Sequence, residues 1–247
     1  MVQFKNIVLV IIIGIISMVT RHANAQQIDT DSAGLTPSEV SLISISALTA
    51  KGDLEKLRLS LEQGLSSGLT VNDIKEILIH TYAYCGFPRS IRGLQTFMEV
   101  MDDRKQRGIQ DNLGRFASDI DQTESKYNRG KSILDRLTGT VSADTLSGYS
   151  AFAPPIDVFL KEHLFADIFE RDVLNYVQRE LVTVSVIAAI ERAEPMLRSH
   201  LTICLNIGLS EKRLQQYVDT LRSTLGEPEA RSAQSVLNEV MENYKSK

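Results

Sequence analysis

Apolar residues recur along most of this chain at the spacing of amphipathic helices. The clearest case is the stretch 180–208, which the pattern predicts to be two helices joined by a short polar turn. The first helix, about Val177 to Glu191, has an apolar face made of Leu181, Val184, Ile187 and Ala188. The second, about Pro195 to Ile207, has apolar residues at i, i+4, i+7 and i+8, namely Leu197, Leu201, Cys204 and Leu205.

One histidine lies at the edge of the second apolar stripe. His200 follows Leu197 by three residues and precedes Cys204 by four, so it lies beside the buried face of its helix. Glu180 stands at the start of the partner helix. A polar imidazole at the rim of an apolar helix pair, with a carboxylate nearby, is the best candidate site in the sequence.

The same stretch has a counterpart upstream. Alignment of Lys56 to Thr70 with Met196 to Ser210 matches several leucines, one arginine and one glycine without a gap. With one residue inserted, Glu39 falls on Glu180, while Ser60 stands where His200 stands. Two tandem copies of one helical unit are the simplest interpretation.

The remaining pattern is also helical. Thr36-Pro37-Ser38-Glu39 starts a helix with a capping box, and no convincing strand alternation occurs, so the predicted fold is all-α. Further helices are expected at about 54–67, 70–84, 89–104, 124–137, 156–169 and 229–244. The charged stretch 102–122 is predicted to be a linker or a short helix, and 138–155 a loop. We divide the chain into a flexible leader at 26–34, a first unit at 35–105, a linker with a helix at 106–155, and a second unit at 156–247.

Two polar residues of the predicted third helix form a second candidate group. Ile74, Ile77 and Leu78 mark the buried face, and Glu76 and His80 fall on the opposite side. By default this places His80 on a solvated face, paired with Glu76 at i, i+4. The alternative is that this face lines a cleft in an oligomer.

The N-terminal segment 1–25 has the features of a secretory signal peptide. Lys5 precedes an apolar run from Ile7 to Val19, and Ala23-Asn24-Ala25 forms a cleavage signal. The apolar run is short for a membrane span, which needs ~20 residues, so we expect cleavage and a periplasmic or secreted protein without a membrane anchor. The alternative is an uncleaved N-terminal anchor.

Composition excludes several classes of function. Removing the signal peptide, which has Lys5 and Arg21 but no acid, changes the formal charge from −4 to −6, so no nucleic-acid partner is expected. The histidines lie on separate segments, without H-x3-H or C-x2-C spacing, so we predict no metal site and no cofactor. Cys85 and Cys204 can form a disulfide in an oxidising compartment, but two separate buried thiols are the favoured interpretation.

Three stretches resemble the carboxymuconolactone decarboxylase family, which includes the alkylhydroperoxidase D-like proteins. Residues 127–139, YNRGKSILDRLTG, resemble its opening segment. Residues 179–214, beginning R-E-L and containing His200 and the N-x-G-L turn, resemble its core. Residues 74–91 resemble its E-x3-H-x3-Y-x-G-x-P segment, with Tyr84, Gly86 and Pro88 in place. Together they cover most of the chain beyond the signal peptide.

The resemblance implies a tandem all-α alkylhydroperoxidase D-like fold and a ring-shaped homo-oligomer, a trimer where single-copy relatives are hexamers. It also implies a small-molecule substrate. The alkylhydroperoxidase D-like members carry a CxxC four and seven residues before the histidine, where this chain has Met196 and Ala193. A thiol peroxidase needs an attacking thiolate and a resolving cysteine, and both are missing from these positions.

We therefore expect acid–base lyase chemistry on a small carboxylated lactone or a related carbonyl acid. His200 is the predicted proton donor and Glu180 its partner. Arg198 is either a clamp for the substrate carboxylate or an ordinary surface charge. His80, Tyr84 and Glu76 are candidate substrate-binding residues from the other copy or another subunit. Two alternatives remain: an alkylhydroperoxidase or peroxiredoxin-type antioxidant protein, and a non-catalytic helical oligomer that binds a small molecule.

Overall fold

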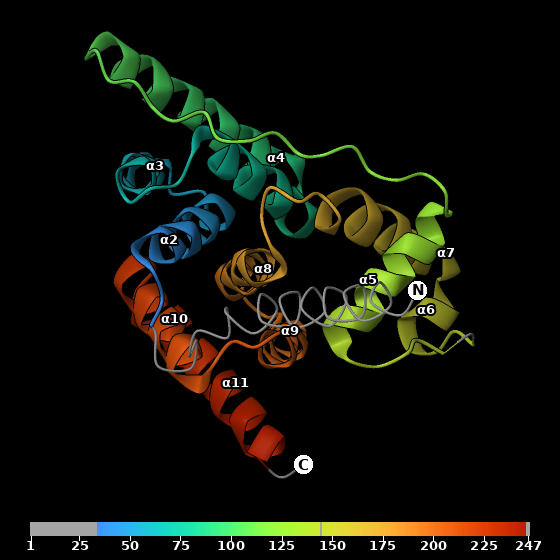
Figure 1. Ribbon diagram of the computed structural model, residues 1–247. Helices are drawn as coiled ribbons and strands as arrows, with labels where there is room; N and C mark the ends of the chain where they lie inside the picture. The colour runs from blue at the N-terminus through green and yellow to red at the C-terminus, as the bar shows by residue number, and fades with distance from the viewer. Residues whose placement is uncertain (1–33, 144, 246–247) are drawn as a thin grey trace, which may run out of the picture. The chain divides into compact units, whose positions relative to one another are not determined.

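The computed structural model describes residues 34–143 and 145–245 (Figure 1). The predicted signal peptide and almost all of the predicted flexible leader lie outside these residues. The all-α prediction is confirmed, since the described residues form helices and no strand. The helices are α2 (Pro37–Lys51), α3 (Leu54–Ser66), α4 (Val71–Gln106), α5 (Lys126–Thr138), α6 (Gly148–Phe152), α7 (Pro154–Val158), the π-helix η1 (Phe159–Phe169), α8 (Tyr176–Ile190), α9 (Glu194–Asn206), α10 (Glu211–Thr224) and α11 (Glu227–Lys245). None of them is long and apolar enough to cross a membrane.

Equivalent helix ends show the repeat directly. Helices α2, α3 and α4 correspond to α8, α9 and the pair α10–α11, and the N-caps of α3 and α4 are separated by the same stretch of chain as those of α9 and α10. The third helix of each copy ends at a glycine with positive φ, Gly86 in α4 (φ 79°) and Gly226 between α10 and α11 (φ 116°), and Pro88 or Pro228 follows. Glycine tolerates this backbone conformation and proline suits the first turn of the next helix segment.

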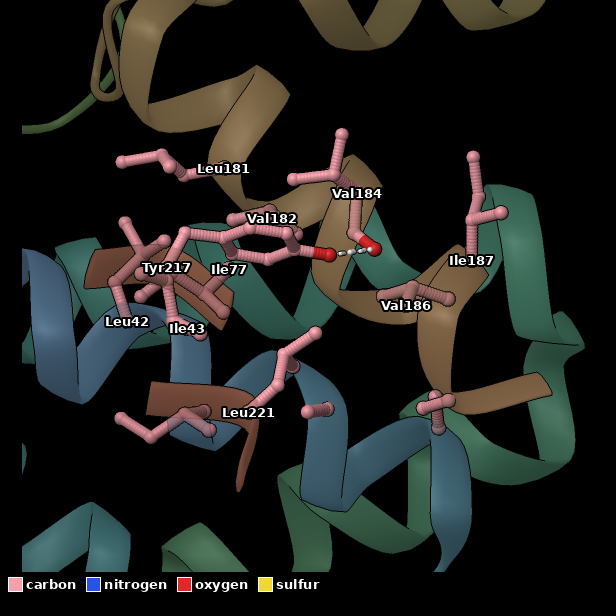
Figure 2. Close-up of a cluster of buried hydrophobic side chains, with 14 of the residues drawn as sticks. Leu42, Ile43, Ile77, Leu181, Val182, Val184, Val186, Ile187, Tyr217 and Leu221 are labelled. Carbon is pink, nitrogen blue, oxygen red and sulfur yellow. Dashed lines mark hydrogen bonds between the residues drawn. The ribbon is translucent and has the colours of Figure 1, made fainter. Parts of the chain in front are cut away.

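The two copies pack through their first helices. Helix α2 lies against α8, while α4 of the first copy packs on α8 and α10 of the second copy packs on α2. The sequences of α2 and α8 are therefore apolar on nearly all sides, as expected of helices enclosed by others. Figure 2 shows the resulting core, where the Tyr217 hydroxyl donates a hydrogen bond of 2.8 Å to the Val184 carbonyl and remains satisfied although fully buried.

Helices α5 and η1 form a second apolar cluster against α9 and α4. The cluster contains Leu137, Phe165, Phe169 and Ile203, with Tyr84 packed against it. Helix α5 lies inside the stretch predicted as a linker with a helix, and the structure packs it on η1. The stretch 138–155, predicted to be a loop, contains the short helix α6 and the start of α7, so the loop prediction is wrong there.

The family-like segment at the start of α5 has a structural role. Tyr127 donates to the Asp157 carboxylate at 2.7 Å, and the Lys161 ammonium donates to both Tyr127 and Asp157 at 2.8 Å. These contacts fasten α5 to α7 and η1. Gly130 allows the close approach, because a Cβ atom there would lie 1.7 Å from the backbone oxygen of Lys161.

Replacement of Gly130 by alanine is expected to destabilise the protein. The added methyl group meets backbone, not a flexible side chain, so α5 must move away from η1. Overpacking of this kind costs about 1–3 kcal/mol. Chemical denaturation should show a lower free energy of unfolding for Gly130→Ala, with little change in Ser132→Ala, at an exposed position on the same helix. Equal stability of the two variants would contradict this account of the helix contact.

Candidate functional site

The candidate site is built around a histidine–carboxylate pair between α8 and α9. His200 Nδ1 lies 2.8 Å from Glu180 Oε2. The Glu180 side chain is fully buried, whereas that of His200 is 15% exposed. A carboxylate beside Nδ1 holds the Nδ1–H tautomer, which leaves Nε2 as the nitrogen able to exchange a proton with a ligand. The geometry therefore suits a proton donor or acceptor oriented by a buried acid.

The third helix of the other copy completes the surroundings of this pair. Helix α4 contributes Tyr84, whose ring meets that of His200 edge-on with centroids 5.8 Å apart. One turn earlier on α4, His80 stacks on Tyr84 at 5.6 Å and packs against Phe169 of η1 at 4.9 Å. The structure thus brings together four residues that the sequence singled out: Glu180, His200, His80 and Tyr84.

Two polar atoms beside the pair are buried without a hydrogen-bond partner among the described residues. They are Glu180 Oε1 and the Tyr84 hydroxyl. Burial, with a smaller contribution from the Glu180 charge, raises the pKa of Tyr84 well above its usual value. Tyr84 is therefore a neutral phenol that can donate a hydrogen bond at physiological pH.

Glu76 and His80 are buried, so the prediction that they lie on a solvated face is wrong. They are 2% and 0% exposed. The face of α4 opposite the apolar stripe packs on α8, whose Arg179 pairs with Glu76 at 3.0 Å. Arg171 binds the same carboxylate through two hydrogen bonds of 2.8 and 3.0 Å. The face of α4 is polar because it matches buried polar groups of the other copy.

His80 does not pair with Glu76 as predicted. Its Nδ1 lies 3.1 Å from Arg179 Nη1 and its Nε2 lies 2.9 Å from Thr183 Oγ1. Burial, and then the neighbouring Arg179 charge, lower the pKa of His80 well below its usual value. Arg171, Arg179 and Thr183 also belong to this network, although the sequence did not single them out. The sequence contained one indication of this network: Arg179 lies in a helix that is apolar on nearly all sides, so its charge is expected to be buried and paired.

Arg198 lies outside the site. An α-helix turns by about 100° per residue, so a separation of two residues places Arg198 on nearly the opposite face of α9 from His200. Its guanidinium pairs with Glu239 of α11, with Nε 3.0 Å from the carboxylate, and it is 41% exposed. The structure therefore removes the expected carboxylate clamp from the neighbourhood of His200.

The repeat generates a second, equivalent position that lacks this chemistry. The N-caps of α2 and α8 align Thr36 with Asn175, so Glu39 corresponds to Gln178, and Ser41 to Glu180. The predicted match of Glu39 with Glu180 is wrong, because the inserted residue is Arg192 in the turn after α8. At the equivalent position the site residues are replaced as a set, by Ser41 for Glu180, Ser60 for His200, Gln216 for Glu76, Thr220 for His80 and Thr224 for Tyr84.

Neither cysteine is paired, and neither is activated. Cys204 is fully buried, and burial raises its pKa well above the usual value. Burial raises the pKa of Cys85 to about 11, although its thiol donates to the Thr81 carbonyl. Within residues 34–143 and 145–245, no three His, Cys, Asp or Glu side chains are grouped so as to hold a metal ion.

Comparisons with known proteins agree with the repeat. The sequence model of the carboxymuconolactone decarboxylase family matches residues 18–97 and 154–239, the first region beginning inside the predicted signal peptide. The chain is also 33% identical over 70 residues to a 4-carboxymuconolactone decarboxylase of Acinetobacter baylyi, a match that covers 28% of this chain and 52% of that protein. The chain thus spans about half the length of this curated relative. The two matched regions cover most of the two helical copies, and the chain therefore belongs to the carboxymuconolactone decarboxylase family as a two-copy member.

Proposed function

We propose that this protein is an acid–base lyase that acts on a small carboxylated lactone or a related carbonyl acid. The observation that carries the proposal is the 2.8 Å contact between His200 Nδ1 and a fully buried Glu180. Family membership supports the reaction class, and the relative from Acinetobacter baylyi is a decarboxylase of this kind.

The proposed reaction needs one carbon–carbon bond to break and one carbon–hydrogen bond to form. As CO2 leaves, the electron pair of the broken bond moves into the conjugated carbonyl system and gives a dienolate. His200 Nε2 takes up a proton from solvent, delivers it to carbon as the dienolate collapses, and is reprotonated by solvent. Glu180 accepts from Nδ1–H and so keeps Nε2 directed away from the carboxylate and available to the substrate. Positioned proton transfer of this type contributes about 10²–10⁴-fold in rate.

The test is turnover by the purified chain beside a matched pair of variants. Release of CO2 from 4-carboxymuconolactone and related carboxylated lactones should fall at least about 10²-fold in His200→Asn. Ser60→Ala, at the equivalent position of the other copy, should keep the activity of the unaltered protein. If His200→Asn retains full activity, the assigned proton donor is wrong. If no compound is turned over, the small-molecule-binding oligomer becomes the better hypothesis.

A thiol-based antioxidant function is disfavoured by the state of both cysteines. The nucleophile in such chemistry is the thiolate. Burial raises the pKa of Cys85 to about 11 and raises the pKa of Cys204 well above its usual value, so both thiols are inert near neutral pH. In the native protein at pH 7.5, we expect negligible reaction with a thiol-specific disulfide reagent. Complete reaction should follow unfolding in denaturant. A native thiol that reacts rapidly at this pH would revive the peroxidase hypothesis.

The proposal includes export and self-association, as the N-terminal sequence and the family resemblance predict. Expression of the full chain in a Gram-negative host should give a periplasmic protein whose first residue is Gln26. Its mass in solution should be that of a trimer. A cytoplasmic product that retains residues 1–25 would contradict export, and a monomeric mass at micromolar concentration would contradict the predicted assembly.

A further inference from the structure

A series of buried hydrogen bonds leads from α8 to the candidate site, and its direction is fixed by chemistry. Arg179 Nη1 lies 3.1 Å from His80 Nδ1. A guanidinium has only donors, so Nδ1 must be the unprotonated, accepting nitrogen. A neutral imidazole then carries its proton on Nε2, which is 2.9 Å from Thr183 Oγ1. His80 therefore donates to Thr183.

The groups around His80 oppose any other protonation state. Arg179 faces Nδ1, and its charge is shared with Glu76, which also binds Arg171. The aromatic rings of Tyr84 and Phe169 cover the imidazole, and His200 lies beyond Tyr84. A proton on Nδ1 would point at the donating guanidinium of Arg179, in a place where His80 is fully buried. Both nitrogens are thus committed, one as acceptor and one as donor.

The series leads toward Tyr84. Because Thr183 accepts from His80, its own hydroxyl proton is free to be donated, and this hydroxyl acts against the rise of the Tyr84 pKa. Tyr84 lies one turn after His80 on α4 and its ring stacks on the imidazole. The Tyr84 hydroxyl has no hydrogen-bond partner among the described residues, and neither has Glu180 Oε1. An unsatisfied buried polar group costs about 1–3 kcal/mol, so this is a place where a polar guest is favoured.

We propose that Arg179, His80 and Thr183 form a one-directional hydrogen-bond relay that positions Tyr84, and that the Tyr84 hydroxyl donates to the reacting carbonyl oxygen of an enolisable carbonyl substrate. This rests on the proposed lyase function. Arg179, His80 and Thr183 are positioning residues, and Tyr84 is the group that touches substrate. As the dienolate forms, negative charge develops on the carbonyl oxygen, and a neutral donor already aimed at it stabilises that charge.

The relay can be tested without any substrate. In the full chain labelled with 15N at histidine, and with the His80 signal assigned by its loss in His80→Gln, the spectrum should show an unprotonated Nδ1 and a protonated Nε2 for His80. This state should persist from pH 5 to pH 9. A His80 that becomes doubly protonated in this range, or that carries its proton on Nδ1, would overturn the relay.

The role of Tyr84 is tested by the kinetics of conservative variants on 4-carboxymuconolactone. Loss of one oxyanion donor typically lowers kcat about 10²–10³-fold, and we expect such a fall in Tyr84→Phe with KM little changed. Thr183→Val should lower kcat and Thr183→Ser should restore it. Ser44→Ala, which removes the equivalent hydroxyl bound to Thr224 in the other copy, should have no effect.

The outcomes separate the two proposals. Unchanged kcat in Tyr84→Phe, or a Thr183→Ser variant as slow as Thr183→Val, overturns the relay to Tyr84 while the lyase function stands. If the unaltered protein turns over no carbonyl acid, the lyase function fails and the donor role of Tyr84 fails with it. The tautomer of His80 then decides the Arg179–His80–Thr183 part independently, since that measurement is made on the unaltered protein and needs no substrate.

Discussion

A helix enclosed on all sides can carry charged residues only if neighbouring helices supply their partners. Helix α8 is such a helix, and it carries two fully buried charged residues in succession, Arg179 and Glu180. Isolated charges in a protein interior are strongly unfavourable, and removing one member of a buried pair costs about 3–5 kcal/mol. The placement of the surrounding helices follows from this constraint. Helix α4 brings Glu76 to Arg179, and α9 brings His200 to Glu180.

The same constraint explains why only one of the two equivalent positions has the features of a reactive site. In α2, the residues that correspond to Arg179 and Glu180 are Val40 and Ser41, so no buried charge needs a partner there. The facing residues have changed with them. Thr220 replaces His80, and Thr224 replaces Tyr84 and binds Ser44 at 2.9 Å. Two hydroxyl groups bind each other between α2 and α10, whereas charged residues pair around α8. The two copies therefore differ by a matched set of residues on two helices that belong to different copies.

The sequence allowed prediction of the helices, the repeat and the closeness of His200 to Glu180, because these depend on local periodicity and on short connections between helices. It failed for His80, since a single helix with one apolar stripe gives no sign that its polar face meets another polar face. Only the packing of α4 on α8 shows that Arg179 lies opposite. The predicted alignment of the two copies was also wrong at their first helices, where it matched Glu39 with Glu180. The extra residue, Arg192, lies in a turn where Glu191 and Arg192 both have positive φ, and sequence matching placed the gap incorrectly.

The buried polar groups that lack hydrogen-bond partners favour a site that binds a ligand over one that has lost its function. Ala193 and Met196 stand where the alkylhydroperoxidase D-like members carry a CxxC, and Met196 is exposed, so no thiol is present at these positions. Glu180 Oε1 and the Tyr84 hydroxyl are buried without a partner among the described residues. Each costs about 1–3 kcal/mol, and the second copy shows that threonine and serine can fill the equivalent space without such a cost. Buried polar groups without a hydrogen-bond partner are expected at positions that bind a ligand. The unsatisfied groups beside His200 and Glu180 are unfavourable for stability, which is the physical reason to look for a substrate there.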